Sequence, residues 1–343
     1  MKIYKILFWV FLSTIGLYSC SDKEEVPVIV EEEPKPSAGF EFELVDPNDP
    51  FTYKFTNKST NFKDVRWNFA DDSTSSEVSP VHTFLNTGTF NVKMVVLNGD
   101  GYWAQREETI RINPSNLINV ITSATGAGKL KISYETNMTV GSTSWQDGYA
   151  NSAPVISTED NTELTFTPGA FKEIKLNIKT PKGSTAYLNL LVAELGIIKD
   201  LTNVDNTFTI SHENGGGPDG GEGSKKLIDN NNTTKVFLGG VGNNLWWKFE
   251  YFVPQIINGY KMTSGNDAPE RDPKTWKIEG SDDGTTWTIV DQRSNEEWTE
   301  RRQSRTFIFE NNTPYKHYRF SMTELRSGTN FQMSEVRLFQ IPK

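Results

Sequence analysis

The sequence predicts an all-β protein built from several sandwich domains. Segments 90–96 (FNVKMVV) and 172–179 (KEIKLNIK) alternate apolar and polar residues, as strands with one buried face do. Turn signals such as 98–101 (NGDG) and 181–183 (PKG) separate these segments. The 26 Gly and 16 Pro interrupt the chain often, while 9 Trp and 21 Phe supply apolar cores. Short strands at this spacing are typical of β-sandwiches, and 343 residues are expected to form more than one domain.

Residues 1–19 are predicted to be a secretory signal. Lys2 and Lys5 precede a short apolar run, 6–15 (ILFWVFLSTI), whereas a membrane-spanning helix needs about 20 apolar residues. Ser19 and Cys20 resemble a bacterial lipobox, which implies cleavage before Cys20 and lipidation of its thiol. Cys20 is the single cysteine, so the chain has no internal disulfide. An ordinary signal peptide that happens to contain a cysteine is the alternative.

Residues 20–37 are predicted to be an acidic, proline-containing tether. Segment 21–25 (SDKEE) resembles the short acidic signal that sends Bacteroidetes lipoproteins to the outer face of the outer membrane, although a solvated charge run has the same composition. Segment 26–37 (VPVIVEEEPKPS) cannot bury enough apolar surface to order itself. We therefore expect a lipid-anchored outer-membrane protein that faces the cell exterior.

The net charge argues against nucleic acid as a partner. Without Lys2 and Lys5, 33 of the 35 basic side chains remain against 44 acidic ones, which is a net charge of −11. An acidic chain repels phosphate backbones, and no basic stripe is visible in the sequence.

Residues 38–113 contain three motifs in a fixed order. They are 67–72 (WNFADD), 79–84 (SPVHTF) and 87–90 (TGTF), and together they resemble the polycystic kidney disease (PKD) module. The resemblance implies a seven-stranded immunoglobulin-like sandwich. Ala70 and Asp72 stand where the family prefers Gly, so an altered turn is expected there. His82 has no second His or Cys nearby, and we expect a structural role for it rather than a catalytic or metal-binding one.

Residues 114–198 resemble a degenerate second copy of this module. At an offset of about 80 residues, Trp145 falls near the position of Trp67, and Phe166, Gly169 and Phe171 fall at those of Phe84, Gly88 and Phe90. The fold predicted for residues 38–198 is therefore a tandem of immunoglobulin-like sandwiches. Such modules usually act as spacers, and neither copy shows a site.

Residues 199–343 contain many motifs in a characteristic order. They include 227–235 (LIDNNNTTK), 246–251 (WWKFEY), 276–287 (WKIEGSDDGTTW), 315–320 (YKHYRF) and 333–339 (MSEVRLF). This succession resembles the coagulation factor 5/8 type C (discoidin) domain, which implies an eight-stranded jelly-roll sandwich. Bacterial members are often family 32 carbohydrate-binding modules. Trp276, Tyr318 and Phe320 are expected in the core, and one of Trp246 and Trp247 must face outward.

The same resemblance implies a structural calcium ion. Hard cations take six to eight oxygen ligands from carboxylates, amides, hydroxyls and carbonyls. The ligands carried over are the side chains of Asp229, Thr234 and Glu335 and the backbone carbonyls of Leu227 and Asn232. Asn230 stands where the family prefers Gly, and Asn tolerates the left-handed turn. An Asn-rich turn without a metal is the alternative.

A ligand surface is expected at the loop tips. Sugar binding needs an apolar face against the ring and planar polar groups that reach pairs of hydroxyls. Loops in the family's ligand position are 236–245, 266–273 and 294–302. The residues expected to contact a ligand are Asn266, Arg271, Trp298 and Arg301. Trp298 is included because it lies in a polar run (SNEEWTERRQ) with no alternation to bury it. Arg271 between two acidic residues is equally compatible with a structural ion pair.

These features favour a non-catalytic surface protein that binds a poly- or oligosaccharide, and an outer-membrane uptake complex is a further expected partner. Adhesion to host or matrix protein or to mucin is the second hypothesis. An enzyme is disfavoured, because the sequence has no G-x-S-x-G, no H-E-x-x-H, no Cys/His pair and no segment left to form a catalytic domain.

Overall fold

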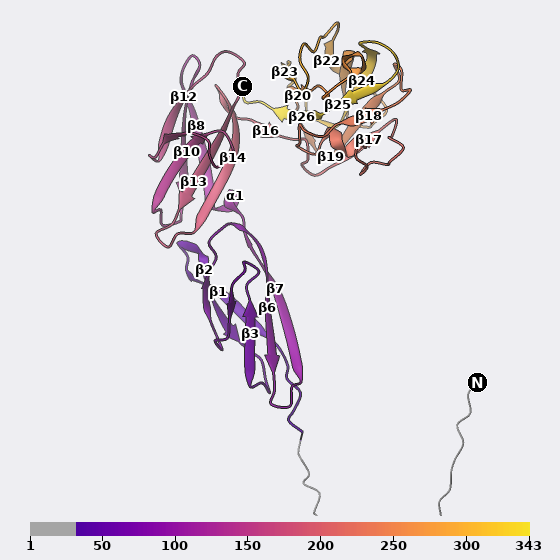
Figure 1. Ribbon diagram of the computed structural model, residues 1–343. Helices are drawn as coiled ribbons and strands as arrows, with labels where there is room; N and C mark the ends of the chain where they lie inside the picture. The colour runs from indigo at the N-terminus through magenta and orange to yellow at the C-terminus, as the bar shows by residue number, and fades with distance from the viewer. Residues whose placement is uncertain (1–31) are drawn as a thin grey trace, which may run out of the picture.

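The computed structural model describes residues 32–343, and the expected lipidation site Cys20 lies outside this range. Residues 32–343 form 26 strands and only short helical turns, which confirms the all-β prediction. Three sandwiches follow one another: the first two lie end to end, and the third lies beside the second (Figure 1). None of the helices in this range has the length and apolar composition needed to cross a lipid bilayer.

The first sandwich has a three-stranded sheet, β1-β2-β5, and a four-stranded sheet, β4-β3-β6-β7. Trp67, Phe69 and Phe84 fill the core between them, as the alternation predicts. The ring of His82 stacks on Phe69 at 4.0 Å, and its Nε2 lies 2.8 Å from Asp71, which agrees with a structural role. The strands are β1 (Phe40–Asp46), β2 (Asp49–Asn57), β3 (Asp64–Asn68), β4 (Thr74–Ser75), β5 (Val81–Thr83), β6 (Gly88–Leu97) and β7 (Trp103–Ile112).

The turn after β3 keeps a left-handed backbone without glycine. Ala70 has φ 61° and Asp72 has φ 68°, in the region that the family's glycines reach at no steric cost. The side chain of Asn68 accepts a hydrogen bond from the Ala70 amide at 2.8 Å. This local bond helps to hold a conformation that is unfavourable for alanine.

The second sandwich repeats the strand order of the first. Its sheets are β12-β9-β8 and β11-β10-β13-β14-β15, which correspond to β5-β2-β1 and β4-β3-β6-β7. Trp67 and Trp145 are both buried, and each indole N–H donates to a backbone carbonyl at 3.0 Å, of Glu77 and of Glu159. The elements are α1 (Pro114–Leu117), β8 (Ile118–Gly126), β9 (Lys129–Thr136), β10 (Ser142–Asp147), β11 (Val155–Ser157), β12 (Asn161–Thr165), β13 (Lys172–Lys179), β14 (Thr185–Ala193) and β15 (Gly196–Ile197). This equivalence supports the inferred duplication.

The first two sandwiches make direct contacts. The Ser184 hydroxyl donates to the Phe84 carbonyl at 2.8 Å, and the Thr185 amide donates to the Leu85 carbonyl at 2.9 Å. Lys182 forms an ion pair with Asp49 at 2.7 Å. Backbone bonds that cross the junction limit relative movement of the two sandwiches more than a flexible linker would.

The third sandwich packs a five-stranded sheet, β17-β19-β24-β21-β22, on a four-stranded sheet, β16-β26-β20-β23. Trp247, Trp276, Tyr318 and Phe320 are fully buried between the sheets, as expected for Trp276, Tyr318 and Phe320. A two-stranded sheet, β18-β25, closes one end. The elements are β16 (Lys199–Asp200), β17 (Asn206–Ile210), η1 (Ser224–Leu227), β18 (Val236–Leu238), β19 (Trp246–Gln255), β20 (Gly259–Thr263), η2 (Pro269–Arg271), β21 (Pro273–Ser281), β22 (Thr288–Arg293), β23 (Ser304–Ile308), β24 (Tyr315–Leu325), β25 (Phe331–Met333) and β26 (Glu335–Gln340).

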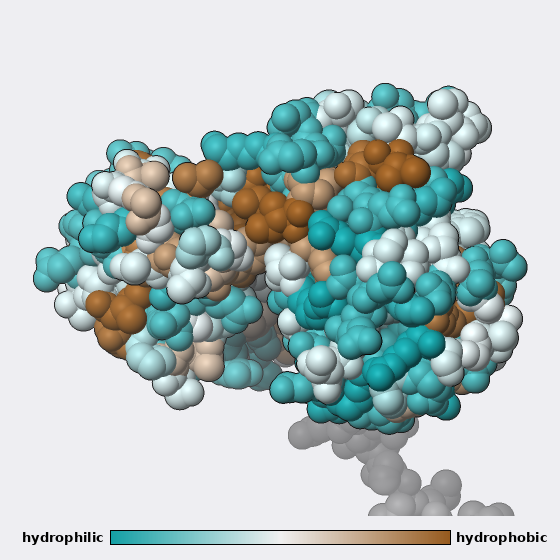
Figure 2. All heavy atoms as spheres, turned by 90° about the horizontal axis from the view of Figure 1, so that it is seen from above, coloured by the Kyte–Doolittle hydropathy of each residue, from teal (hydrophilic) through white to brown (hydrophobic). Residues whose placement is uncertain are grey.

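The second and third sandwiches share a small apolar cluster. Phe171 contacts Phe339 edge to face, with ring centroids 5.9 Å apart, and Ile198 is buried beside them. Phe171 aligns with Phe90 in the duplication, yet Phe90 lies in its own core whereas Phe171 packs on the next domain. Viewed from above, apolar residues gather between the two lobes (Figure 2), where Ile197 and Ile341 line a groove.

Candidate functional site

The loop after η1 brings together three of the expected calcium ligands. The backbone amides of Asn230 and Asn231 donate to the two carboxylate oxygens of Glu335, each at 3.2 Å. The Thr234 hydroxyl donates to the Asp229 carboxylate at 2.9 Å. Asn230 has φ 58°, as expected for an asparagine in place of glycine. The first strand residue of β26 is thereby joined to a loop 105 residues earlier.

The electrostatics of Glu335 fit a bound cation. Its side chain is buried, and this burial raises the pKa of Glu335 to about 8, despite the nearby Arg337 guanidinium. A carboxylate in such a place is stabilised as an anion by a compensating positive charge. Within residues 32–343, no three His, Cys, Asp or Glu side chains cluster as metal ligands, so an ion here would depend on carbonyl and hydroxyl oxygens besides two carboxylates.

The remaining two expected ligands are positioned differently. Asn232 lines a cavity together with Asn230 and Glu335. Leu227 ends η1, and its side chain is buried in the core of the third sandwich. The ammonium group of Lys226 lies 3.5 Å from the Asp229 carboxylate and already neutralises part of its charge.

The structure contradicts the expectation that Trp298 is exposed. Its side chain is 2% exposed, and its indole N–H donates to the Pro273 carbonyl at 3.0 Å. The guanidinium of Arg305 lies over the ring at 5.2 Å. A lone tryptophan in a polar run therefore anchors its loop to the core, an outcome that alternation cannot detect.

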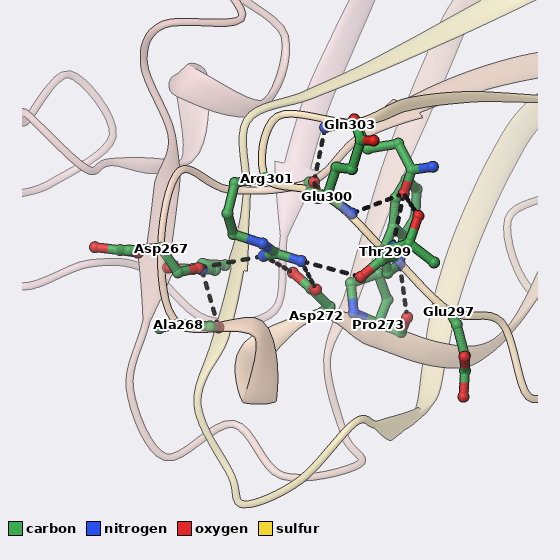
Figure 3. A network of polar contacts seen from close by, with 12 residues as sticks. Asp267, Ala268, Asp272, Pro273, Glu297, Thr299, Glu300, Arg301 and Gln303 are labelled. Atoms are coloured by element: carbon green, nitrogen blue, oxygen red, sulfur yellow. Dashed lines mark hydrogen bonds and ion pairs between the residues drawn. The ribbon is translucent and has the colours of Figure 1, made fainter.

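Arg301 connects two loops through its ion pair and hydrogen bonds, and its side chain is only partly exposed to solvent. It forms a two-pronged ion pair with Asp272, whose side chain is fully buried, and donates to the carbonyls of Asp267 and Trp298 at 3.2 and 3.4 Å (Figure 3). The hydrogen bonds that Arg301 donates to Asp272 raise the pKa of Arg301, so it stays charged. With its Nη donors used inside the protein, Arg301 is a positioning residue for the loops 266–273 and 294–302, contrary to its expected place on the binding face.

Asn266 and Arg271 do lie at the surface. Asn266 is exposed, and among residues 32–343 its side-chain amide makes no hydrogen bond. Arg271 is part-exposed; its guanidinium stacks over the ring of Phe237 at 4.8 Å, and its nearest carboxylate is Glu270 at 3.8 Å. Asp267 pairs with Lys235 at 2.8 Å, and this hydrogen bond lowers the pKa of Asp267. We call Lys235, Asn266, Asp267, Glu270 and Arg271 the rim.

Trp246 is an exposed aromatic side chain of this domain, as is Phe252 farther along β19. Trp247 is fully buried and stacks on Phe320, whereas Trp246 is 36% exposed. Trp246 follows the candidate loop 236–245, in which Asn243 and Asn244 are also exposed. The adjacent pair showed that one tryptophan faces outward, but only the register of β19 on β24 decides which one.

Family comparisons agree with this architecture. The model of the PKD domain matches residues 31–113, and the model of the F5/8 type C domain matches residues 207–336. The chain contains a PKD domain and an F5/8 type C domain. Both matches confirm the resemblances indicated by the sequence motifs. The candidate cation loop, the rim and Trp246 all belong to the F5/8 type C domain.

Solved structures similar to this chain include family 32 carbohydrate-binding modules. One, from Clostridium perfringens in complex with GalNAc-β-1,3-galactose, is 18% identical, with a TM-score of 0.36, over 41% of this chain and 100% of that one. A second C. perfringens module, in complex with galactose, is 14% identical, with a TM-score of 0.35, over 42% and 100%. An F5/8 type C domain from Bacteroides fragilis is 16% identical, with a TM-score of 0.37, over 43% and 98%.

One curated relative matches part of the chain. It is a peptide-N(4)-(N-acetyl-β-glucosaminyl)asparagine amidase from Arabidopsis thaliana, 36% identical over 93 residues, which is 25% of this chain. This chain spans 12% of the length of that protein.

Proposed function

We propose that this chain is a non-catalytic carbohydrate-binding protein whose F5/8 type C domain takes a poly- or oligosaccharide at the rim. The observation that carries the proposal is the exposed rim itself, whose loop 266–273 is held to the loop 294–302 by the ion pair between Asp272 and Arg301. A rigid scaffold under exposed polar groups reduces the entropy lost on binding. The PKD domain and the second sandwich serve as spacers.

The rim has the chemistry that a sugar requires. Asn266 offers an amide donor and acceptor, and the planar guanidinium of Arg271 offers donors in a fixed orientation because it is stacked on Phe237. Asp267 accepts hydrogen bonds from adjacent hydroxyls while Lys235 holds it in place. Planar groups of this kind match pairs of neighbouring hydroxyls.

A glycan array and titration calorimetry test this proposal. The chain carries Cys20→Ser, which prevents lipidation, and is compared with Arg271→Ala and Asn266→Ala variants. Each variant is expected to weaken saccharide binding about tenfold, because each removes hydrogen bonds to hydroxyls. Arg66→Ala removes an exposed arginine from the PKD domain and serves as the matched control. Unchanged affinity in both rim variants would refute the assignment of the rim.

Trp246 is tested in the same assay. Trp246→Ala removes the exposed tryptophan that follows the candidate loop 236–245 of the F5/8 type C domain, and Trp103→Ala removes a tryptophan that is 63% exposed in the PKD domain. A loss confined to Trp246→Ala adds the outer face of β19 to the sugar site. Retention on mucin-free matrix protein without binding to any glycan would instead favour the adhesin hypothesis.

We further propose that the loop 227–234 and Glu335 hold a structural calcium ion. Asp229, Thr234 and Glu335 would contribute side-chain oxygens, and Leu227 and Asn232 backbone carbonyls. An ion that binds only the folded state stabilises it by about 2.7 kcal/mol at a hundred times its Kd. Calcium is therefore expected to raise the melting temperature relative to EDTA, and Glu335→Gln to remove this difference, whereas Glu310→Gln, a fully exposed control, keeps it. An identical melting temperature with calcium and with EDTA would exclude the ion.

We also propose that Cys20 is lipidated and anchors the chain to the outer membrane, where it faces the exterior and serves an uptake complex. The basis is the sequence of residues 1–25. Labelled palmitate is expected to enter the wild-type chain but not Cys20→Ser, and protease added to intact cells is expected to release the sandwiches. Equal labelling of both chains would exclude lipidation at Cys20.

A further inference from the structure

A second polar cavity lies between the second sandwich and the F5/8 type C domain. It has a volume of about 510 Å³, within the range of roughly 300–1,000 Å³ typical of small-molecule sites. Tyr149, Glu173 and Asn189 line it from the second sandwich, and Asp200, Lys261 and Arg337 line it from the other side. The proposed calcium site also borders it, through Asn230, Asn232 and Glu335. Neither domain forms this cavity alone, and it is separate from the rim.

The walls of the cavity are fixed by contacts between the two domains. Phe171 and Phe339 pack edge to face beside it, and Phe339 also contributes to its lining. The guanidinium of Arg337 donates to the Asp200 carboxylate at 2.7 Å through Nε and contacts the side chain of Asn230. This bridge ties β16, β26 and the loop 227–234 together, so one wall is held rigidly.

Four polar side chains in the cavity have no partner in the protein. Among residues 32–343, the side chains of Tyr149, Glu173, Asn189 and Lys261 make no hydrogen bond or ion pair with another residue. Burial, followed by the charge of Glu173, raises the pKa of Tyr149, so its hydroxyl is neutral and both donates and accepts at neutral pH. Polar groups that converge on a cavity without internal partners are available to a ligand.

The lining indicates which ligand chemistry fits. Glu173 and Lys261 carry opposite charges and Arg337 is paired with Asp200, so the part of the lining outside the proposed calcium site has no strong net charge. The free groups comprise an acceptor, a donor, an amide and a phenol. A ligand that can pair with all four of these side chains needs groups that both donate and accept hydrogen bonds, as sugar hydroxyls do. The ring of Tyr149 supplies an aromatic surface.

We infer that this interdomain cavity is a second saccharide site, which takes a neutral, hydroxyl-rich unit between Glu173 and Asn189 on one side and Lys261 on the other. Because its walls come from two domains, an occupant would also hold these domains in a fixed orientation. The inference is independent of the rim.

Calorimetry and hydrogen–deuterium exchange on the full chain with Cys20→Ser test the inference. The probes are a panel of neutral mono- and disaccharides. At least one sugar is expected to bind and to slow exchange in the segment 147–175. The double variant Glu173→Gln, Asn189→Ala is expected to weaken this binding about tenfold or more, because it removes hydrogen bonds at exposed positions. Glu159→Gln, an exposed glutamate in the same sandwich, is the matched control.

Comparison with Arg271→Ala separates the two proposed sites. If the double variant loses saccharide binding and Arg271→Ala keeps it, the result supports the cavity as the saccharide site and does not support the rim. Loss in Arg271→Ala alone, with no exchange protection in 147–175, overturns the cavity and supports the rim. Failure of every sugar in the panel to bind also overturns the cavity, which then holds water only.

Discussion

The side chain of His317 gives the third sandwich a sensitivity to pH. It is buried in β24, its Nδ1 has no hydrogen-bond partner, and the Glu250 carboxylate lies 3.8 Å away. Burial lowers the pKa of His317 below its ordinary value of 6.5, and the opposing charge of Glu250 does not offset this. The folded chain therefore binds this proton less tightly than the unfolded chain does, and stability is lost as the pH falls below about 6.5.

The first prediction concerns this residue. Glu335, whose pKa is raised by burial, binds its proton more tightly in the folded chain and changes the stability in the opposite direction. The His317 contribution is therefore measured as a difference: the urea midpoint of His317→Gln is expected to rise relative to that of the wild-type chain between about pH 7.5 and about pH 5.5, because the variant lacks the titrating group. His212→Gln keeps His317 and is expected to follow the wild-type chain. The measurement is urea unfolding followed by tryptophan fluorescence at both pH values. A difference between His317→Gln and the wild-type chain that does not change with pH would contradict the assignment.

At the scale of elements, the ion pair between Asp272 and Arg301 holds the loop 266–273, which carries most of the rim, to the loop 294–302. The Asp272 side chain is fully buried, and Arg301 is its bidentate partner. Removing one member of a buried pair leaves an uncompensated charge, at a cost of roughly 3–5 kcal/mol. Arg301→Met is therefore expected to destabilise the F5/8 type C domain by about that amount.

The double variant Asp272→Leu, Arg301→Met provides the control for this second prediction. It removes both charges, so it is expected to recover much of the lost free energy of unfolding. Urea unfolding of all three chains gives the coupling between the residues. A double variant as unstable as Arg301→Met would show that the loops depend on the shape of the pair and not on its charge.

For the whole molecule, the contact between Phe171 and Phe339 joins the second sandwich to the F5/8 type C domain. Aromatic pairs contribute about 0.5–1.5 kcal/mol beyond the area that they bury. Phe171→Ala is expected to lower the melting temperature of the F5/8 type C domain and to separate its transition from that of the second sandwich in calorimetry. Phe252→Ala, at a position that is 70% exposed, is the control. A single unchanged transition in Phe171→Ala would show that the aromatic contact does not couple the domains.

The sequence by itself determined the all-β class, the two modules that family comparisons matched, and the core positions of Trp67, Trp145 and Trp276. Alternation and turn signals are properties of short sequence segments, so they are the same however the strands are arranged in space. Asn230 was also predictable, because the preference for left-handed backbone is a property of single residues.

Tertiary structure alone decided which polar-loop residues face solvent. Trp298 and Arg301 occupy a run without periodicity, and only the position of β21 beneath that run buries the indole and pairs the guanidinium with Asp272. The register of β19 on β24 exposed Trp246, and the docking of two domains created the cavity around Glu173 and Lys261. These outcomes depend on partners that are distant in sequence, so no local pattern in the chain encodes them.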